Sequence, residues 1–289
     1  MDLTIVIVSF QSGEILHRCL KSINNNYPVI IIENSINYNL KVELENKYQN
    51  LKCILPDENL GYGAGNNLGI KQAKTKYVLI LNPDTILNDK TIPNLLLQAN
   101  IHKDFAIMGP RVIENENITL NSNENICVSV EYLKGFAILF NKEKFKDLDY
   151  FDENYFLYFE EIDLCKRIIN SGNKIYLVKN ALIKHIGGHS HEEKFSFEIE
   201  LSRNWHWIWS KFYYNKKNFG YLKALKECVL TFFSSLIKTL YYFIIGNNHK
   251  RKIYFNRVSG FYNALIGKSS WYRPNLDDQA TETYRKNNF

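Results

Sequence analysis

The stretch LTIVIVSF, residues 3–10, is a run of apolar and β-branched side chains in which the polar Ser9 stands next to the last position. Such a run is typical of a strand that is buried on both faces of a parallel sheet. Similar runs follow at residues 29–34, 51–56 and 77–84, and helices are expected between them at 14–26, 39–49 and from 65 to 73. This alternation predicts an α/β fold with a doubly wound, mostly parallel sheet.

Polar residues stand where each of these strands ends. Sheets of this type bind ligands at the carboxyl ends of their strands. The candidate positions on this basis are Ser9, Glu33 with Asn34, residues 57–59 and residues 82–84.

The second half of the chain is more mixed. Strands are expected at residues 106–113, 130–142 and 174–186, with a helix at 156–171. Near residue 200 the composition changes. We therefore expect a catalytic domain over residues 1–200 and a helical region over residues 201–289.

Charge separates these two regions. Residues 1–200 carry 21 Lys and Arg against 26 Asp and Glu, whereas residues 201–289 carry 15 against 4, a net charge of +11. A basic region of this kind suits nucleic acid, an anionic membrane or an acidic partner. The five cysteines are odd in number and without metal-ligand spacing, which is typical of a reduced, cytoplasmic protein. No signal peptide is expected at the first apolar run.

The basic region contains the apolar stretch 222–246, which follows the aromatic-rich residues 205–214. Its longest uncharged run, residues 228–237, is half of the roughly 20 residues that a membrane-spanning helix needs. We expect an amphipathic helix at a membrane interface, and favour this over nucleic acid because aromatic and basic residues adjoin it. Packing on the catalytic domain, or a homo-oligomer interface, remains the alternative.

A glycine-rich segment, ENLGYGAGNNLGI, occupies residues 58–70. Its glycines permit a close approach of backbone to a phosphate or nucleotide, although a flexible turn before a helix is the simpler explanation. A Rossmann fingerprint is excluded, because that motif belongs at the first strand–helix turn and ends in another glycine. Further along, Asp84 in NPD could hold a hard divalent cation, or the tripeptide could be an ordinary turn.

Three carboxylates crowd the stretch YFEEIDLCKR, residues 158–167. Asp163 is four residues from Arg167 and can pair with it on a helix. Glu160 and Glu161 are left at the helix start, either as a solvated first turn or as a catalytic base. In HIGGHSH, residues 185–191, three histidines could suggest zinc, but an oxygen-rich site prefers a hard metal.

Taken in order, these motifs resemble family 2 glycosyltransferases of the GT-A fold, and among them the rhamnosyltransferase-like group of bacterial polysaccharide synthesis. The resemblance covers about residues 3–192. It rests on VIVSF (6–10), IENS (32–35), the glycine-rich segment, LNPDT (81–85), LKGFAILF (133–140), FDENYFLYFEEIDLCKRI (151–168) and IKHIGGHS (183–190).

The resemblance implies a role for each matching residue. Ser9 and Glu33 would lie by the nucleoside of the donor, and Asn59, Gly61 and Asn66 would line its pocket. Asp84 would bind Mg²⁺ or Mn²⁺ on the diphosphate, and His185 would complete the metal shell. Glu161 would be the general base, with Glu160 as the other candidate. NPD keeps only the last acid of the family's DXD motif, and Glu161 and Glu33 stand where Asp is usual.

The expected activity is inverting transfer of a hexose from a nucleoside-diphosphate sugar to a hydroxyl of a glycan or lipid-linked glycan. The resemblance weakly favours rhamnose, and UDP-linked hexoses remain open. Expected partners are this donor, the acceptor and a membrane surface, without nucleic acid, on the cytoplasmic side of the inner membrane. The alternatives are a nucleotidyltransferase and an inactive nucleotide-sugar-binding subunit.

Overall fold

A computed structural model describes residues 2–113, 125–186 and 195–275. The chain divides into two compact units. The sheet unit comprises residues 1–152 and 161–192, and the helical unit comprises residues 153–160 and 193–289.

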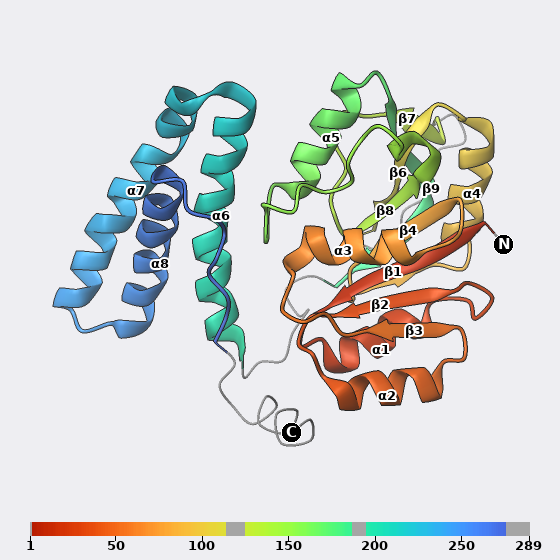
Figure 1. The fold of residues 1–289 in the computed structure, drawn as a ribbon, viewed down its shortest axis with the longest axis horizontal. Coiled ribbons are helices and arrows are strands. Elements are labelled where there is room, and N and C mark those ends of the chain that lie inside the picture. The colour runs from red at the N-terminus through yellow and green to blue at the C-terminus, as the bar shows by residue number, and fades with distance from the viewer. Residues whose placement is uncertain (1, 114–124, 187–194, 276–289) are drawn as a thin grey trace. The chain divides into compact units, whose positions relative to one another are not determined.

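The sheet unit is built on one nine-stranded sheet (Figure 1). Eight strands follow the order β3-β2-β1-β4-β8-β6-β9-β5, and β7 pairs with β9. The strands are β1 Leu3–Ser9, β2 Val29–Glu33, β3 Leu51–Ile54, β4 Tyr77–Leu81, β5 Thr85–Leu87, β6 Phe105–Val112, β7 Cys127–Ser129, β8 Ala137–Asn141 and β9 Lys174–His185.

The parallel arrangement expected from the first four apolar runs is confirmed. β3, β2, β1 and β4 pair parallel to one another, and β6 pairs parallel to β9. The other pairings, β4 and β6 with β8 and β5 and β7 with β9, are antiparallel. Half of the pairings are therefore antiparallel, which an apolar run by itself does not reveal.

Helices cover both faces of this sheet, which explains why its strands are apolar throughout. One face packs against α1 Gly13–Lys21, α2 Tyr38–Lys47 and α4 Thr91–Ile101. The other packs against α3 Gly61–Gln72 and α5 Glu160–Asn170. Along β1, Ile5 and Ile7 enter the first core and Val6 enters the second, as the alternation of a strand requires.

The helical unit contains three long helices that lie side by side (Figure 1). They are α6 Ser196–Phe219, α7 Tyr221–Ile244 and α8 Asn248–Leu265. Their common core is aromatic, with Trp205, Phe212 and Phe261 buried. The stretch 222–246, expected to be helical, is α7.

The helix expected at residues 156–171 begins later, at Glu160. The two residues before it, Tyr158 and Phe159, both have φ of +71°, which is left-handed backbone that bulky residues rarely adopt. Within the helical unit, Phe159 packs against Tyr214, and Ser210 donates a hydrogen bond to the carbonyl of Leu157 at 2.8 Å. Contacts with α6 therefore hold this segment in a non-helical path directly before the two glutamates.

The glycine-rich segment was expected to be a loop up to residue 65, but most of it is helix, because α3 begins at Gly61. Gly61 has a φ of +76° and makes the entry turn. Gly65 and Gly69 lie against β1, where an added Cβ would come within 3.1 Å and 2.3 Å of the side chains of Val8 and Val6. These two glycines serve the packing of helix on sheet, which offsets their low helix propensity.

We predict that Gly69→Ala destabilises the protein by about 1–3 kcal/mol, because overpacking at Val6 outweighs the gain in helix propensity. The measurement is urea unfolding. Val6→Ala removes the clashing methyl groups, so the double variant should lose less stability than the sum of the two single variants. Additive losses, or a more stable Gly69→Ala, would contradict this explanation.

Candidate active site

Buried polar atoms without a hydrogen-bond partner gather near the carboxyl ends of β1, β2 and β4. Among the described residues these include Ser9 Oγ, Asn34 Oδ1, Asn66 Oδ1 and Asp84 Oδ1. Buried polar groups in folded proteins are nearly always hydrogen-bonded, so such a cluster points to a ligand that satisfies them. Sequence reasoning placed three of these residues at the site, and Asn34 only by its position at a strand end.

Asn34 ties the end of β2 to the start of α3. Its backbone N–H donates to the carbonyl of Ser9 at 2.8 Å, and its Nδ2 donates to the carbonyl of Gly61 at 3.0 Å. Asn59 accepts a hydrogen bond from the N–H of Gly61 at 3.0 Å. The structure thus brings together Ser9, Asn59 and Gly61, three of the positions expected to contact the donor.

Glu33 is fully buried, and its carboxylate is used by its own turn. One oxygen accepts from the N–H of Ser35 at 3.2 Å, and the other accepts from the N–H of Asn37 at 2.7 Å. Burial raises the pKa of this carboxyl, although these hydrogen bonds lower it in part. Through these hydrogen bonds Glu33 stabilises the turn between β2 and α2. Its contact with the nucleoside stays a prediction.

The two adjacent amides of α3 have different surroundings. Asn67 donates to the carbonyl of Phe151 at 2.8 Å and accepts from its N–H at 3.0 Å. Asn66 donates to the carbonyl of Tyr62 at 3.0 Å and leaves its oxygen without a described partner. Asn66, which the resemblance places in the donor pocket, therefore has an oxygen available for a ligand, while Asn67 holds the chain that leads to α5.

Asp84 and His185 lie next to each other at the junction of β4 with β5. Thr85 pairs with His185 across the antiparallel β5–β9 ladder, which places Nε2 of His185 3.4 Å from Oδ1 of Asp84. The ring of Phe136 stacks on His185 with centroids 4.6 Å apart. Asp84 is 4% exposed, and the carboxylate oxygen that faces His185 accepts no hydrogen bond from the described residues.

These two side chains fit a divalent cation that also binds ligands from elsewhere. A buried carboxylate oxygen without a donor, beside an imidazole nitrogen, offers two ligands, and Mg²⁺ usually takes its other ligands from phosphate and water. Among residues 2–113, 125–186 and 195–275 no three His, Cys, Asp or Glu side chains converge. His189 and His191, considered above for zinc, lie outside the described residues.

The two glutamates at the start of α5 differ in their surroundings. Glu160 is only 4% exposed and belongs to the helical unit. Glu161 is half-buried in the sheet unit, and its Oε1 accepts a hydrogen bond from the Tyr132 hydroxyl at 3.2 Å. Burial raises the pKa of the Glu161 carboxyl, outweighing the opposing effects of backbone N–H groups and Tyr132.

The third carboxylate of the cluster is structural. Oδ2 of the fully buried Asp163 lies 2.8 Å from Nε of Arg167, which confirms the pair expected from their spacing. Arg167 also donates to the backbone carbonyls of Asp149 and Tyr150. This arginine fastens α5 to the preceding loop.

The segment between β7 and β8, residues 130–136, contacts both Glu161 and the Asp84–His185 pair. Tyr132 contacts Glu161, and Phe136 contacts His185. A Cβ added to Gly135 would lie 3.7 Å from Cβ of Glu161, and the carbonyl of Gly135 accepts a hydrogen bond from Tyr62 of α3. The expected strand at 130–142 is therefore partly wrong, because β8 begins only at Ala137. Sequence reasoning gave no role to Tyr132, which directly precedes the motif LKGFAILF, or to Phe136, which lies within it.

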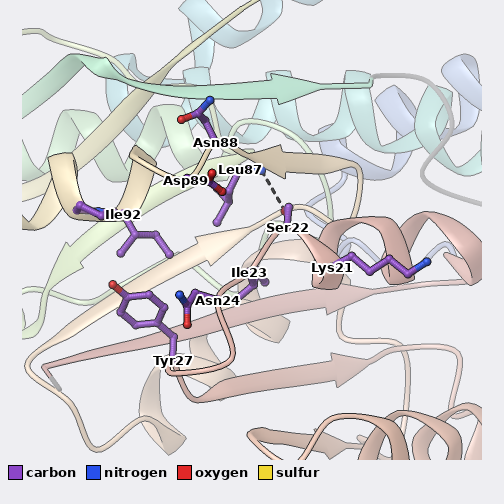
Figure 2. Close-up of a pocket in the computed structure, with 10 residues that line it drawn as sticks. Lys21, Ser22, Ile23, Asn24, Tyr27, Leu87, Asn88, Asp89 and Ile92 are labelled. Carbon is purple, nitrogen blue, oxygen red and sulfur yellow. Dashed lines mark hydrogen bonds between the residues drawn. The ribbon is translucent and has the colours of Figure 1, made fainter.

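A hollow of about 260 Å³ lies at the opposite, amino-terminal ends of the strands (Figure 2). It is lined by the end of α1, the start of α4 and Tyr27, and Ser22 accepts a hydrogen bond there from the N–H of Leu87 at 3.1 Å. None of the predicted site residues lines it. The candidate active site is thus a separate feature of the sheet.

Two curated relatives are similar to this chain in sequence. The chain is 26% identical over 192 residues to the low-salt glycan biosynthesis hexosyltransferase Agl10 of Haloferax volcanii, a match that covers 57% of this chain and 61% of that protein. It is 23% identical over 261 residues to the rhamnosyltransferase WbbL of Escherichia coli, covering 76% and 98%.

Solved structures agree with the fold. TarS residues 1–349 of S. aureus, in complex with UDP-GlcNAc, superposes with a TM-score of 0.54 at 15% identity and covers 96% of this chain and 95% of that one. The sheet with its helices is thus the GT-A type expected from the sequence. The sequence model of glycosyl transferase family 2 matches residues 4–165, more than half of the chain. The chain therefore belongs to family 2 of the glycosyltransferases.

Proposed function

We propose that this protein transfers a hexose from a nucleoside-diphosphate sugar to a hydroxyl group of a glycan or lipid-linked glycan, with inversion at the anomeric carbon. The observation that carries the proposal is the segment 130–136, which links the half-buried Glu161 with the Asp84–His185 pair. The name of the Escherichia coli relative makes a rhamnosyl donor the first to test. The five free thiols support a cytoplasmic location.

The donor would bind at the carboxyl ends of β1, β2 and β4. Ser9, Asn34 and Asn66 offer buried polar atoms for its nucleoside and sugar. Asn59 and Gly61 shape the entry to α3, where the backbone makes its positive-φ turn. The S. aureus structure with UDP-GlcNAc supports a nucleotide sugar as the donor class.

Asp84 and His185 would hold the divalent cation, Mg²⁺ or Mn²⁺. A cation bound there neutralises the charge of the diphosphate leaving group. Asp84 is kept in place by its backbone, whose carbonyl accepts from the N–H of Ile186 at 3.0 Å. Phe136 fixes the plane of the His185 ring by stacking on it.

Glu161 would accept the proton of the acceptor hydroxyl as that oxygen attacks. A base works best when its pKa lies near the operating pH, and burial moves the pKa of Glu161 in that direction. Tyr132 orients the carboxylate through its hydroxyl. Glu160, which is 4% exposed, is the other candidate for this role. Direct displacement by the acceptor needs no enzyme nucleophile.

Glu161→Gln should lower kcat by about 10²–10⁴-fold, the usual contribution of a general base, and leave donor affinity unchanged. Product formation and calorimetric donor binding would be measured on the same preparation. Glu160→Gln is the matched control and should retain most turnover. Loss of activity in Glu160→Gln alone would move the base to that residue, and full turnover in both variants would exclude this mechanism. Absence of transfer in the wild-type protein would favour a binding subunit.

Asp84→Asn should weaken nucleotide-sugar binding about tenfold to a hundredfold in the presence of Mn²⁺ or Mg²⁺, because a charged ligand of the cation is lost. Binding with a chelator present should stay as in the wild-type protein. Asp89→Asn, at an exposed position beyond β5, serves as the control. Equal metal-dependent binding by Asp84→Asn would remove Asp84 from the metal site.

The pH dependence of kcat should report Glu161. Only the ionised carboxylate can accept a proton, so the rate should fall as the pH drops through a pKa above the ordinary glutamate value. Tyr132→Phe removes a hydrogen bond that lowers this pKa, so the acidic limb should move to higher pH with its plateau retained. The control Tyr176→Phe removes a similar contact, to Asp104, and should leave the profile unchanged. An unshifted limb in Tyr132→Phe would contradict the assignment.

A further inference from the structure

Helix α7 has most of its large apolar side chains on the outside, although Leu225 and Phe232 pack against the core of the bundle. Between Tyr221 and Ile244 its only fully buried residues are small, namely Ala224, Cys228 and Ser235. By contrast, Leu230 is 79% exposed and Ile244 is 81% exposed. A helix that packs on a core normally shows the reverse arrangement.

These exposed side chains form one face, which we call the α7 apolar face. Successive residues of an α-helix are about 100° apart, so positions three, four and seven apart share a side. The small buried residues lie on the opposite side, toward α6 and α8. The face consists of Leu230, Phe233, Ile237, Leu240, Tyr241 and Ile244.

A cation flanks the end of this face, because Arg251 lies 5.6 Å from the ring centroid of the exposed Phe243. Further cations and rings gather on the side of α7 that faces α8. At the α7–α8 turn, the rings of Tyr242 and Tyr254 stack with centroids 5.6 Å apart. Lys250 lies over the first ring at 5.4 Å and Lys238 over the second at 5.0 Å. Rings with apolar bodies and polar tips, next to basic side chains, are typical of the boundary between lipid and water.

The positive charge of the helical region favours an anionic lipid surface over a second copy of this chain as the partner of the α7 apolar face. Residues 201–289 contain fifteen Lys and Arg and four acids. A second copy of this chain would bring an equally basic surface against it. An anionic lipid surface complements both the apolar side chains and the cations that flank them.

A spanning orientation of α7 is less consistent with its packing. By length and composition α7 is the one helix, within the described ranges, that could cross a membrane. However, it packs on α6 and α8, which carry many charged side chains, and Lys223 and Lys226 lie in its first turns. Crossing would require α7 to leave these two helices.

We propose that the α7 apolar face is a docking surface for an anionic lipid bilayer and lies in its interface, parallel to the membrane. The basic residues 250–252 at the start of α8 contact the lipid headgroups. This inference does not depend on the glycosyltransferase activity, because all of its residues belong to the helical unit.

The test is flotation of the full-length protein with vesicles of phosphatidylcholine, with and without phosphatidylglycerol. The wild-type protein should bind more strongly to the vesicles that contain phosphatidylglycerol, and added salt should weaken that binding. Phe233→Ser/Ile237→Ser should lower the partition coefficient on the order of a hundredfold. Because both side chains are exposed, its Tm should stay unchanged.

A matched control is Leu97→Ser/Ile101→Ser, which removes two exposed apolar side chains four residues apart on α4. It should bind vesicles like the wild-type protein. In Lys250→Gln/Arg251→Gln/Lys252→Gln, the partition coefficient on vesicles that contain phosphatidylglycerol should fall about fivefold for each cation removed. Its partition coefficient on pure phosphatidylcholine vesicles should not change.

Four outcomes would contradict the proposal. One is a wild-type protein that fails to float with either kind of vesicle. Another is a Phe233→Ser/Ile237→Ser variant that binds vesicles as well as its control. The third is a dimer, seen by sedimentation equilibrium, that these two substitutions dissociate while the wild-type protein shows no vesicle binding. Recovery of the protein in the membrane pellet after an alkaline carbonate wash would overturn the interfacial orientation in favour of spanning.

Discussion

The close packing of α3 against β1 is the constraint on which the candidate site depends. Gly65 and Gly69 leave no Cβ between helix and strand, so α3 lies directly on the side chains of Val6 and Val8. In this position α3 makes three hydrogen bonds to other parts of the sheet unit. Gly61 accepts one from Asn34, and Tyr62 donates one to Gly135 in the 130–136 segment. Asn67 donates the third to the backbone carbonyl of Phe151. The position of α3 thus sets the position of three separate segments near the site. A bulkier residue at Gly65 or Gly69 would displace α3 from β1 and shift these segments together.

The proposed base and metal ligands come from distant parts of the sequence, and backbone contacts connect them. The carbonyl of Phe136 accepts hydrogen bonds from Asn82 and Thr85, on either side of Asp84, while its ring stacks on His185. A few residues earlier in the same segment, Tyr132 contacts Glu161. Such a short, well-connected segment keeps the two sets of groups in a constant relation, which displacement at a single carbon atom requires.

The helical unit has an aromatic core, and most of the apolar residues of α7 lie outside it. Its interior is filled mainly by the aromatic side chains of α6 and α8, while the fully buried residues of α7 are small. Leu225 and Phe232 of α7 pack against this core, and most of the other large apolar residues of α7 are exposed. An exposed apolar surface of this kind is rarely retained unless something covers it. The excess of lysine and arginine in the helical region is the reason for proposing an anionic lipid surface as that cover.

The sequence by itself determined the parallel half of the sheet, the family and most of the candidate positions, because buried strands and short motifs are local patterns. It could not separate Glu160 from Glu161, or Asn66 from Asn67, since neighbours in sequence differ only in what the fold places around them. It also left the role of Gly65 and Gly69 open, because close packing is visible only when Val6 and Val8 lie opposite. The antiparallel strand β8 and the contacts of Tyr132 and Phe136 depend on pairing between distant segments. Tertiary structure decided the surroundings of these residues, because burial and hydrogen bonding across the fold, which no local pattern encodes, assign each side chain its partner.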